Sequence, residues 1–348
     1  MEEIGVRGKR NLISPEKRFL FPRLNISLII PPHTMKLFDL HCDTALSCYN
    51  GKKSLVSSDN GLHIAIERAS AFERYTQTLA VFSSPRLTNE EGWNTFLGTA
   101  AMIEEQRKDF PDFFSYVLAV EGGNILDGDI TRVDRMAEMG VRFLTLVWGG
   151  YGCIGGAHSD PEGRGLTDFG RQVVSRCLDL GIIPDVSHSS DAIFDEASGM
   201  AADRGKTIMA THSDSRALCS HKRCLTDEQF RTIVRMKGVV GMNLCRSFIV
   251  DGGDGIPTSI DDLIRHIEHY LSLGGEDTVA MGCDLDGTAP LPLVSDAAGA
   301  REMTGVEDLI LIAERMLRLG YSEKLVEKIF YDNAKAFIDR NGIKEISK

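Results

Sequence analysis

From residue 36 onward the chain repeats one pattern, in which a helical stretch and a break are followed by an apolar run of strand length and then by polar residues. Eight of the apolar runs have the length and the content of β-branched or aromatic residues that are typical of buried strands. These runs are residues 36–42, 77–82, 115–120, 142–148, 182–187, 207–211, 239–244 and 278–283. Strands that alternate with helices in this way predict a parallel sheet of the α/β class.

Glycines and capping residues mark the ends of the expected helices. Four strands are preceded by a glycine that we expect to end a helix in the left-handed conformation, namely Gly140, Gly181, Gly205 and Gly238. Thr226 with Gln229 and Ser259 with Asp262 resemble capping boxes at helix starts. Residues 304–319 and 322–338 have the spacing of amphipathic helices, which predicts two C-terminal helices against the barrel.

The eight strands favour a closed (β/α)₈ barrel, of the TIM type, formed as one domain by residues 35–348. A doubly wound open sheet is the alternative, but it would more often carry a glycine-rich phosphate loop after its first strand, and residues 42–47 (CDTALS) form no such loop. Residues 1–34 differ from the rest and are expected to be a disordered extension that adds nothing to the fold. Their apolar run at 24–30 is too short to cross a bilayer.

The composition narrows the class of partner. A formal charge of −11 and a pI near 5.4 argue against nucleic acid and against an anionic membrane, which favour clustered Lys and Arg. A small molecule is therefore the expected substrate, and a homodimer is left open. The eight cysteines are scattered without a CxxC pair, which indicates reduced thiols and a cytoplasmic location.

Metal-binding residue types follow five of the eight strands. They are His41 and Asp43 at the first strand, Glu121 at the third, His188 at the fifth, His212 at the sixth, and Asp284 and Asp286 at the eighth. Because the reactive residues of a (β/α)₈ barrel lie at the C-terminal ends of its strands, we expect these side chains to meet. His266 and His269 lie within a helical pattern and are expected to be structural.

The spacing of these residues favours zinc. His41 and Asp43 are two positions apart on a strand, so both side chains leave the same face and one ion can take both. Imidazole and carboxylate together suit zinc and leave positions open for water. Two further histidines exceed the needs of one catalytic ion, and a carboxylate such as Glu121 can bridge a pair. The sequence therefore predicts two Zn²⁺ per chain.

Six short motifs carry a resemblance to a known family. They are LHCDT at 40–44, VEGG at 120–123, DVSH at 185–188, THS at 211–213, HKR at 221–223 and GCDLDG at 282–287. Together they resemble the successive motifs of the membrane dipeptidase (renal dipeptidase) family, and the likeness covers nearly everything after Met35. The resemblance implies a (β/α)₈ barrel with a binuclear zinc centre that hydrolyses dipeptides.

The resemblance also implies roles for single residues. His41 and Asp43 would bind one zinc, His188 and His212 the other, and Glu121 would bridge the two ions. Arg223 would bind substrate, and an aspartate after the eighth strand would be catalytic. We assign that role to Asp284 over Asp286, because Asp284 comes directly off the strand.

The chain departs from the family at Trp148, where animal members have a histidine that contacts the substrate carbonyl. An aromatic residue that closes an apolar strand is usually a wall of a pocket, which is the role we expect for Trp148. The glycine-rich residues 149–158 follow it and could bring His158 over the barrel mouth. His158 is thus a second candidate for contact with substrate, as a donor to the developing oxyanion.

The expected reaction is hydrolysis of a dipeptide, including L,D pairs, by a hydroxide that bridges the two metals, with Asp284 passing the proton to the leaving amine. The free carboxylate of a dipeptide is the planar anion that a guanidinium such as Arg223 pairs with. Two alternatives stay open. One is a zinc amidohydrolase for another small amide, such as an N-acyl amino acid, a cyclic amide or a β-lactam. The other is a non-catalytic binding protein on the same barrel.

Overall fold

The computed structural model describes residues 30–31, 33–84, 87–253, 258–289, 294–296 and 299–348. Its main sheet is parallel and has the strand order β5-β4-β3-β2-β1-β7-β6. The strands are β1 (Lys36–Cys42), β2 (Arg74–Phe82), β3 (Phe114–Glu121), β4 (Val141–Thr145), β5 (Ile183–Asp185), β6 (Val240–Met242) and β7 (Val279–Met281). They agree with seven of the eight runs expected from the sequence, although several are shorter.

The remaining run, residues 207–211, is the sixth in chain order, and it closes the sheet into a barrel through two parallel bridges. Met209 pairs with Asp185 at the β5 edge, and Ala210 pairs with Val240 at the β6 edge. Two glycines let neighbouring strands approach this stretch, since a Cβ on Gly241 or on Gly282 would lie 1.9 Å from the carbonyl oxygen of Thr211. The predicted (β/α)₈ barrel is confirmed, with one of its strands reduced to a pair of bridging residues.

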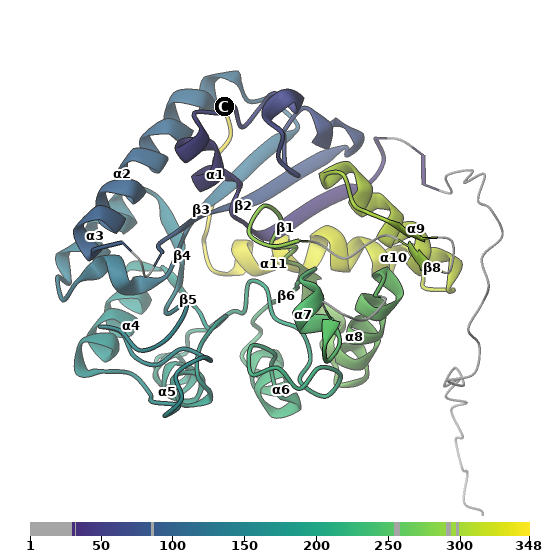
Figure 1. Cartoon of the computed structure of the whole chain (residues 1–348). Helices are drawn as coiled ribbons and strands as arrows, with labels where there is room; N and C mark the ends of the chain where they lie inside the picture. The colour runs from purple at the N-terminus through teal and green to yellow at the C-terminus, as the bar shows by residue number, and fades with distance from the viewer. Residues whose placement is uncertain (1–29, 32, 85–86, 254–257, 290–293, 297–298) are drawn as a thin grey trace, which may run out of the picture.

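Helices surround the strands on the outside of the barrel (Figure 1). They are α1 (Thr44–Gly51), α2 (Asn89–Gln106), α3 (Thr131–Glu138), α4 (Asp168–Leu180), α5 (Asp191–Ala202), α6 (Asp227–Arg235), α7 (Arg246–Ile249), α8 (Ile260–Ser272), α9 (Ile310–Arg318), α10 (Glu323–Glu327) and α11 (Asn333–Arg340). A short antiparallel hairpin, β8 (Val294–Asp296) with β9 (Gly299–Arg301), stands apart from the barrel sheet. None of the described helices combines the length and the apolar composition that crossing a membrane requires.

The capping signals hold with one exception among the glycines. Thr226 caps the N-terminus of α6 and Ser259 caps that of α8, each with the expected capping box. Gly140, Gly181 and Gly205 adopt positive φ as predicted. The prediction for Gly238 is wrong, because the preceding residue Lys237 takes the left-handed conformation, with φ 54°. Gly238 is required for a different reason, since a Cβ there would lie 2.5 Å from the carbonyl oxygen of Ile208.

Apolar side chains from each of the seven strands and from the bridging stretch fill the barrel interior. They are Phe38 and Leu40, Ala80, Val117 and Ala119, Phe143, Ile183, Met209, Val239 and Ala280. Tyr331, Phe337 and Ile343 near the C-terminus belong to the same cluster and cover the end of the barrel at which the strands begin. The opposite end, where the strands finish, is thereby left for polar side chains.

The expected extension, residues 1–34, falls mostly outside the described residues, which begin at Ile30. The part that is described contacts the barrel. The backbone N–H of His33 donates to the carbonyl of Ala71 at 3.0 Å, and the N–H of Ile30 donates to a carboxylate oxygen of Glu314 at 3.4 Å.

Candidate metal centre and substrate pocket

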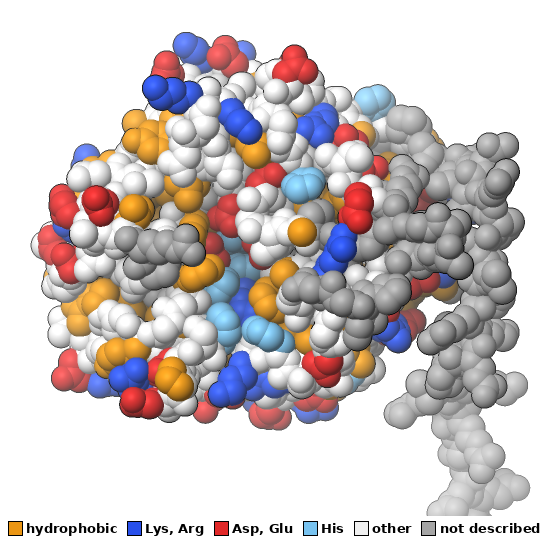
Figure 2. Space-filling view, in the orientation of Figure 1, with side chains coloured by type: hydrophobic (Ala, Val, Ile, Leu, Met, Phe, Trp, Pro, Cys, Tyr) orange, Lys and Arg blue, Asp and Glu red, His pale blue; other side chains and the backbone are white. Residues whose placement is uncertain are grey.

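The predicted site residues meet at the C-terminal end of the barrel. His41 and Asp43 come from the end of β1, Glu121 is the last residue of β3, and His188 and His212 follow β5 and the bridging stretch. All except Asp43 are buried. Figure 2 shows a hollow in the middle of this face, with histidine side chains gathered in it together with acidic and basic ones.

One carboxylate oxygen lies at the centre of the histidines. Oε1 of Glu121 lies 3.0 Å from Nε2 of His188, 3.3 Å from Nε2 of His212 and 3.7 Å from Nε2 of His41. The rings of His41 and His212 stack with their centroids 3.7 Å apart. Glu121 thus contacts the histidines from both predicted metal positions, as a bridging ligand would.

The hydrogen bonds at the far side of two imidazoles fix which ring nitrogen carries a proton. Nδ1 of His188 donates to the carbonyl of Trp148 at 3.1 Å. Nδ1 of His212 lies 2.6 Å from the hydroxyl oxygen of Thr211, whose proton goes to Asp185. In the neutral rings both Nε2 atoms are therefore bare acceptors, and they face each other at 3.0 Å.

This arrangement of acceptors fits a cation. Besides the two facing Nε2 atoms, Nε2 of His41 and Oδ1 of Asp43 are buried and find no hydrogen-bond partner in the described part of the chain. Acceptors that converge without donors repel one another unless a positive charge lies between them. Two groups of three have ligand atoms all within 4.8 Å of one another, one made of His41, Glu121 and His212, the other of His41, Asp43 and Asp284.

The acid–base properties of the cluster point the same way. Burial raises the pKa of the Asp43 carboxyl well above its usual range, and repulsion from Asp284 adds to the effect. Burial and the nearby Asp43 charge also raise the pKa of Glu121. Burial, with the Arg223 charge, lowers the pKa of His41 to about 3. A bound cation would reverse the cost of ionising these carboxyls while leaving the imidazoles neutral.

The two aspartates after β7 point in different directions, which supports the choice of Asp284. Oδ1 of Asp284 lies 3.8 Å from Nε2 of His41, and its Oδ2 accepts a hydrogen bond from Asn243 at 3.0 Å. Burial raises the pKa of Asp284 to about 6. The carboxylate of Asp286 instead accepts bonds from His63 and Thr44, and these outweigh the effect of burial and lower its pKa.

Backbone strain gathers in the same region. Non-glycine residues with positive φ include His188 at 67°, Asp284 at 57° and Asp286 at 67°. Left-handed conformations are costly for residues with a Cβ and cluster at functional sites. Each of these three residues lies just after a strand, where the turn aims its side chain.

The guanidinium of Arg223 lies buried in the site with unused donors. Its side chain is 3% exposed, and Nη1 donates to the hydroxyl of Ser213 at 2.8 Å. Nε and Nη2 have no hydrogen-bond partner among the described residues. A buried guanidinium with free N–H groups is suited to a planar anion such as a carboxylate.

Trp148 and His158 lie at the mouth of the site. Trp148 is 36% exposed, and its ring lies 4.9 Å from that of Phe82 and 5.9 Å from that of His188. Nδ1 of His158 donates to the carbonyl of His188 at 3.3 Å, and burial lowers the pKa of His158 to about 4. The neutral ring then presents Nε2 as an acceptor, which does not suit the predicted role as a donor to an oxyanion.

Three groups around the site were not singled out from the sequence. Asn243 orients Asp284, Asp185 accepts from the backbone N–H and the hydroxyl of Thr211, and His63 pairs with Asp286. Asn243 had a usable signal, because it is a polar residue near the end of a strand like the others. His266 is structural as expected, since Nδ1 accepts from the Ser215 N–H and Nε2 donates to the Ile249 carbonyl.

Comparisons with known proteins bear on this site. The family described as membrane dipeptidase (peptidase family M19) matches residues 32–339. A protein in the pqqA 5′ region of Klebsiella pneumoniae is 31% identical over 242 residues, which cover 68% of this chain and 84% of the relative.

Two solved structures share the fold at 23% identity, each with a TM-score of 0.75. One is the dipeptidase AC, a metallopeptidase of family M19, and the match covers 89% of this chain and 99% of that one. The other is a metallopeptidase from Rhodobacter sphaeroides with a phosphinate mimic of the dipeptide L-Ala-D-Ala, and here the match covers 88% and 99%. With the sequence match over residues 32–339, these findings show that the chain is a peptidase of the membrane dipeptidase family of metallopeptidases, family M19.

Proposed function

We propose that this chain is a zinc-dependent dipeptidase that holds two zinc ions and cleaves dipeptides with a free C-terminal carboxylate. The observation that carries the substrate class is Arg223, a buried guanidinium whose Nε and Nη2 have no partner among the residues that the structure describes. A carboxylate placed there would receive two charge-assisted hydrogen bonds. A substrate whose terminal carboxylate binds Arg223 would place its last peptide bond toward the carboxylates of Asp43, Glu121 and Asp284, and in a dipeptide that is the single peptide bond.

The metal allocation follows the donor atoms. His41 and Asp43 would hold one zinc ion, His188 and His212 the other, and Glu121 would lie between them. Mixed nitrogen and carboxylate donors with few protein ligands per ion are typical of catalytic zinc. Zinc ions bound there would polarise the substrate carbonyl and make hydroxide available near neutral pH.

Asp284 is the group that would move the proton. It would accept a proton from the attacking water and give it to the leaving nitrogen, and in the metal-free chain burial raises its pKa to about 6. The amide of Asn243 holds one oxygen of Asp284, so the other stays toward His41. Asp284 also lies within reach of the ion that His41 and Asp43 would hold.

The mouth residues would act on the ends of the substrate. Trp148 would form a wall beside the histidines, since its ring packs on Phe82 and faces solvent. Nε2 of neutral His158 would accept a hydrogen bond from a substrate N–H. L,D-dipeptides are included in the proposed range, and the mimic bound by the Rhodobacter sphaeroides protein makes L-Ala-D-Ala the first to test.

Metal analysis joined to a substrate panel tests the proposal. The protein, purified without chelators, should contain about two zinc equivalents per chain, and it should cleave free dipeptides faster than N-acetylated dipeptides and N-acyl amino acids. A content of zero or one that added zinc does not raise would overturn the binuclear centre. A preference for N-acyl amino acids, cyclic amides or β-lactams would overturn the substrate class and leave the metal centre standing.

A further inference from the structure

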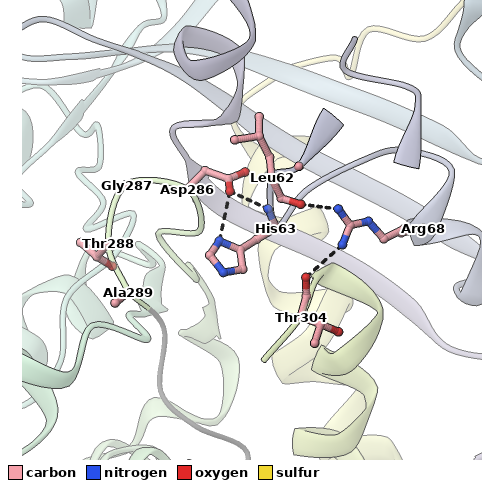
Figure 3. A pocket seen from close by; sticks show the side chains of 9 residues that line it. Leu62, His63, Arg68, Asp286, Gly287, Thr288, Ala289 and Thr304 are labelled. Atoms are coloured by element: carbon pink, nitrogen blue, oxygen red, sulfur yellow. Dashed lines mark hydrogen bonds and ion pairs between the residues drawn. The ribbon is translucent and has the colours of Figure 1, made fainter. Parts of the chain in front are cut away.

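Asp286 lies between the site and a separate cavity. The cavity has a volume of about 550 Å³ and is lined by residues 61–63 and 286–289 together with Arg68 and Thr304. Figure 3 shows the Asp286 carboxylate directed at the backbone and ring of His63, while Thr288 and Ala289 lie across the opening. Asp286 is therefore turned toward the segment that follows α1.

Both oxygens of the Asp286 carboxylate are fully used. Oδ1 accepts from the backbone N–H of His63 at 2.6 Å and from Nδ1 of the same residue at 3.1 Å. Oδ2 accepts from the hydroxyl of Thr44 at 2.6 Å and from the backbone N–H of Ile64 at 3.2 Å. Four donors on a side chain that is 2% exposed make a rigid junction between segments more than 200 residues apart in sequence.

The junction is tied to the predicted metal residues by the backbone. Thr44 directly follows Asp43, and the N–H of Asp43 donates to the carbonyl of Leu285 at 3.1 Å. The N–H of Asp284 donates in turn to the carbonyl of His41 at 3.1 Å. The turn packs closely on both carboxylates, because a Cβ on Gly287 would lie 2.1 Å from Oδ2 of Asp43 and 2.8 Å from Oδ1 of Asp284.

The turn needs outside support to keep this shape. Asp284 and Asp286 both have positive φ, which costs free energy in residues with a Cβ and persists only when neighbours hold it. Within the described residues, the Asp286 carboxylate is held by Thr44, His63 and Ile64.

We infer that Asp286 is a positioning residue, which, through Thr44 and His63, sets the separation of Asp43 and Asp284 and thereby the geometry of one metal position. The inference rests on the proposed metal centre. It assigns to His63 and the segment after α1 a positioning part in the reaction. Partners of metal ligands that hold them in place commonly change metal affinity or activity by about 10–100-fold when they are removed.

Three substitutions of graded severity test the inference. Asp286→Asn places an amide NH₂ against hydrogen-bond donors whichever way the amide is turned. Thr44→Val removes one donor without changing the shape of the side chain. His63→Gln removes the hydrogen bond from the imidazole ring but keeps the one from the backbone N–H. Asp129→Asn is the matched control, because Asp129 also accepts from a backbone N–H and a hydroxyl, both of Thr131, but on the surface.

Zinc affinity is measured by competition with a chromophoric chelator, along with kcat, KM and the melting temperature with and without zinc. We expect Asp286→Asn to weaken the binding of one of the two ions by about 10–100-fold and to lower kcat with little change in KM. Thr44→Val and His63→Gln should show smaller shifts of the same kind, and Asp129→Asn none. The loss in melting temperature should be larger with zinc than without it.

Unchanged affinity for both ions in Thr44→Val and His63→Gln would overturn the inference, even if Asp286→Asn fails to fold. Equal losses of melting temperature with and without zinc would also overturn it, since they would indicate a purely structural role. If the unchanged protein binds no zinc, it is the proposed function that fails, and the variants are then not needed to show it.

Discussion

The two sides of the candidate metal centre carry opposite kinds of side chain. The carboxylate side consists of Asp43, Asp284 and Asp286 after β1 and β7, and the imidazole side consists of His158, His188 and His212 with Arg223. His41 and Glu121 lie between the sides. On the carboxylate side burial and mutual repulsion raise the pKa of Asp43, whereas on the imidazole side burial and the Arg223 charge lower the pKa of His188.

The difference between the two sides predicts one orientation for a dipeptide bound in the site. A dipeptide is itself asymmetric, with a carboxylate at one end, and the cation that suits it lies on the imidazole side. In the proposed mechanism proton transfer belongs to the opposite side, where burial raises the pKa of the metal-free Asp284 to about 6. The two sides can therefore be impaired separately, and four substitutions test whether they are.

Removal of one imidazole ligand should have the largest effect. In His188→Ala, Glu121 and His212 lose their nearest nitrogen, so we expect about one zinc equivalent to remain and nearly all activity to disappear. Elemental analysis and a dipeptide assay measure both. His269→Ala is the control, because its ring pairs with Asp227 and takes no part in the site, and it should keep two equivalents. Loss of both ions in His188→Ala would show that the two sides are not independent.

Loss of the proposed catalytic carboxylate should lower kcat while the metal ions stay bound. Asp284→Asn retains the shape and the bond partner Asn243 but cannot take a proton, so kcat should fall by about 10²–10⁴. Zinc content, measured on the same preparation, should stay near two. Asp286→Asn should lower kcat by less. A reversal of the two effects would mean that the catalytic aspartate has been assigned wrongly.

Arg223→Ala should impair the imidazole side in a way that depends on the substrate. Loss of a charge-assisted contact costs about 1.5–3 kcal/mol, or roughly 10- to 150-fold in kcat/KM, where an anion was bound. Dipeptides with a free carboxylate should lose that much, and their C-terminal amides much less. Arg216→Ala is a control in the same segment, since Arg216 pairs with Asp191. Equal losses on acid and amide would indicate that Arg223 is structural.

His158→Ala should have the smallest effect. Because Nδ1 donates to the His188 carbonyl, Nε2 of the neutral ring can only accept, and we expect kcat on the best dipeptide to fall by less than about threefold, against the roughly 10²–10³ that loss of an oxyanion donor costs. A fall of a hundredfold would show that the ring is protonated or turned in the working enzyme and would restore the donor role.

Much of the fold follows from local sequence, and so does the membership of the site. Apolar runs between helix ends predict strands, and polar residues at the ends of parallel strands must meet when the sheet closes. His41, Glu121 and His212 could therefore be brought together before the structure was known. Residues 207–211 were expected to form a full strand, and the structure shows only two bridging positions there.

What the sequence could not settle depends on backbone angles and on distant partners. The directions of Asp284 and Asp286 are decided by positive φ values in a tight turn, which the spacing of two aspartates does not encode. The pairing of His63 with Asp286 joins residues 223 positions apart. The Gly238 prediction failed because a close contact with Ile208, rather than a helix end, demands the glycine there.

The two-residue closure of the barrel at Met209 and Ala210 has a mechanical consequence. It makes a seam between β5 and residues 207–211, where the N–H of Met209 donates to the Pro184 carbonyl and the N–H of Val186 donates to the Met209 carbonyl, and His188 and His212 follow these two segments. An ion shared by these histidines would hold the two segments together. Metal binding and closure of the barrel would then be coupled. Amide hydrogens around 207–211 should then exchange with solvent sooner in the zinc-free protein than anywhere else in the barrel wall, and zinc should slow them first.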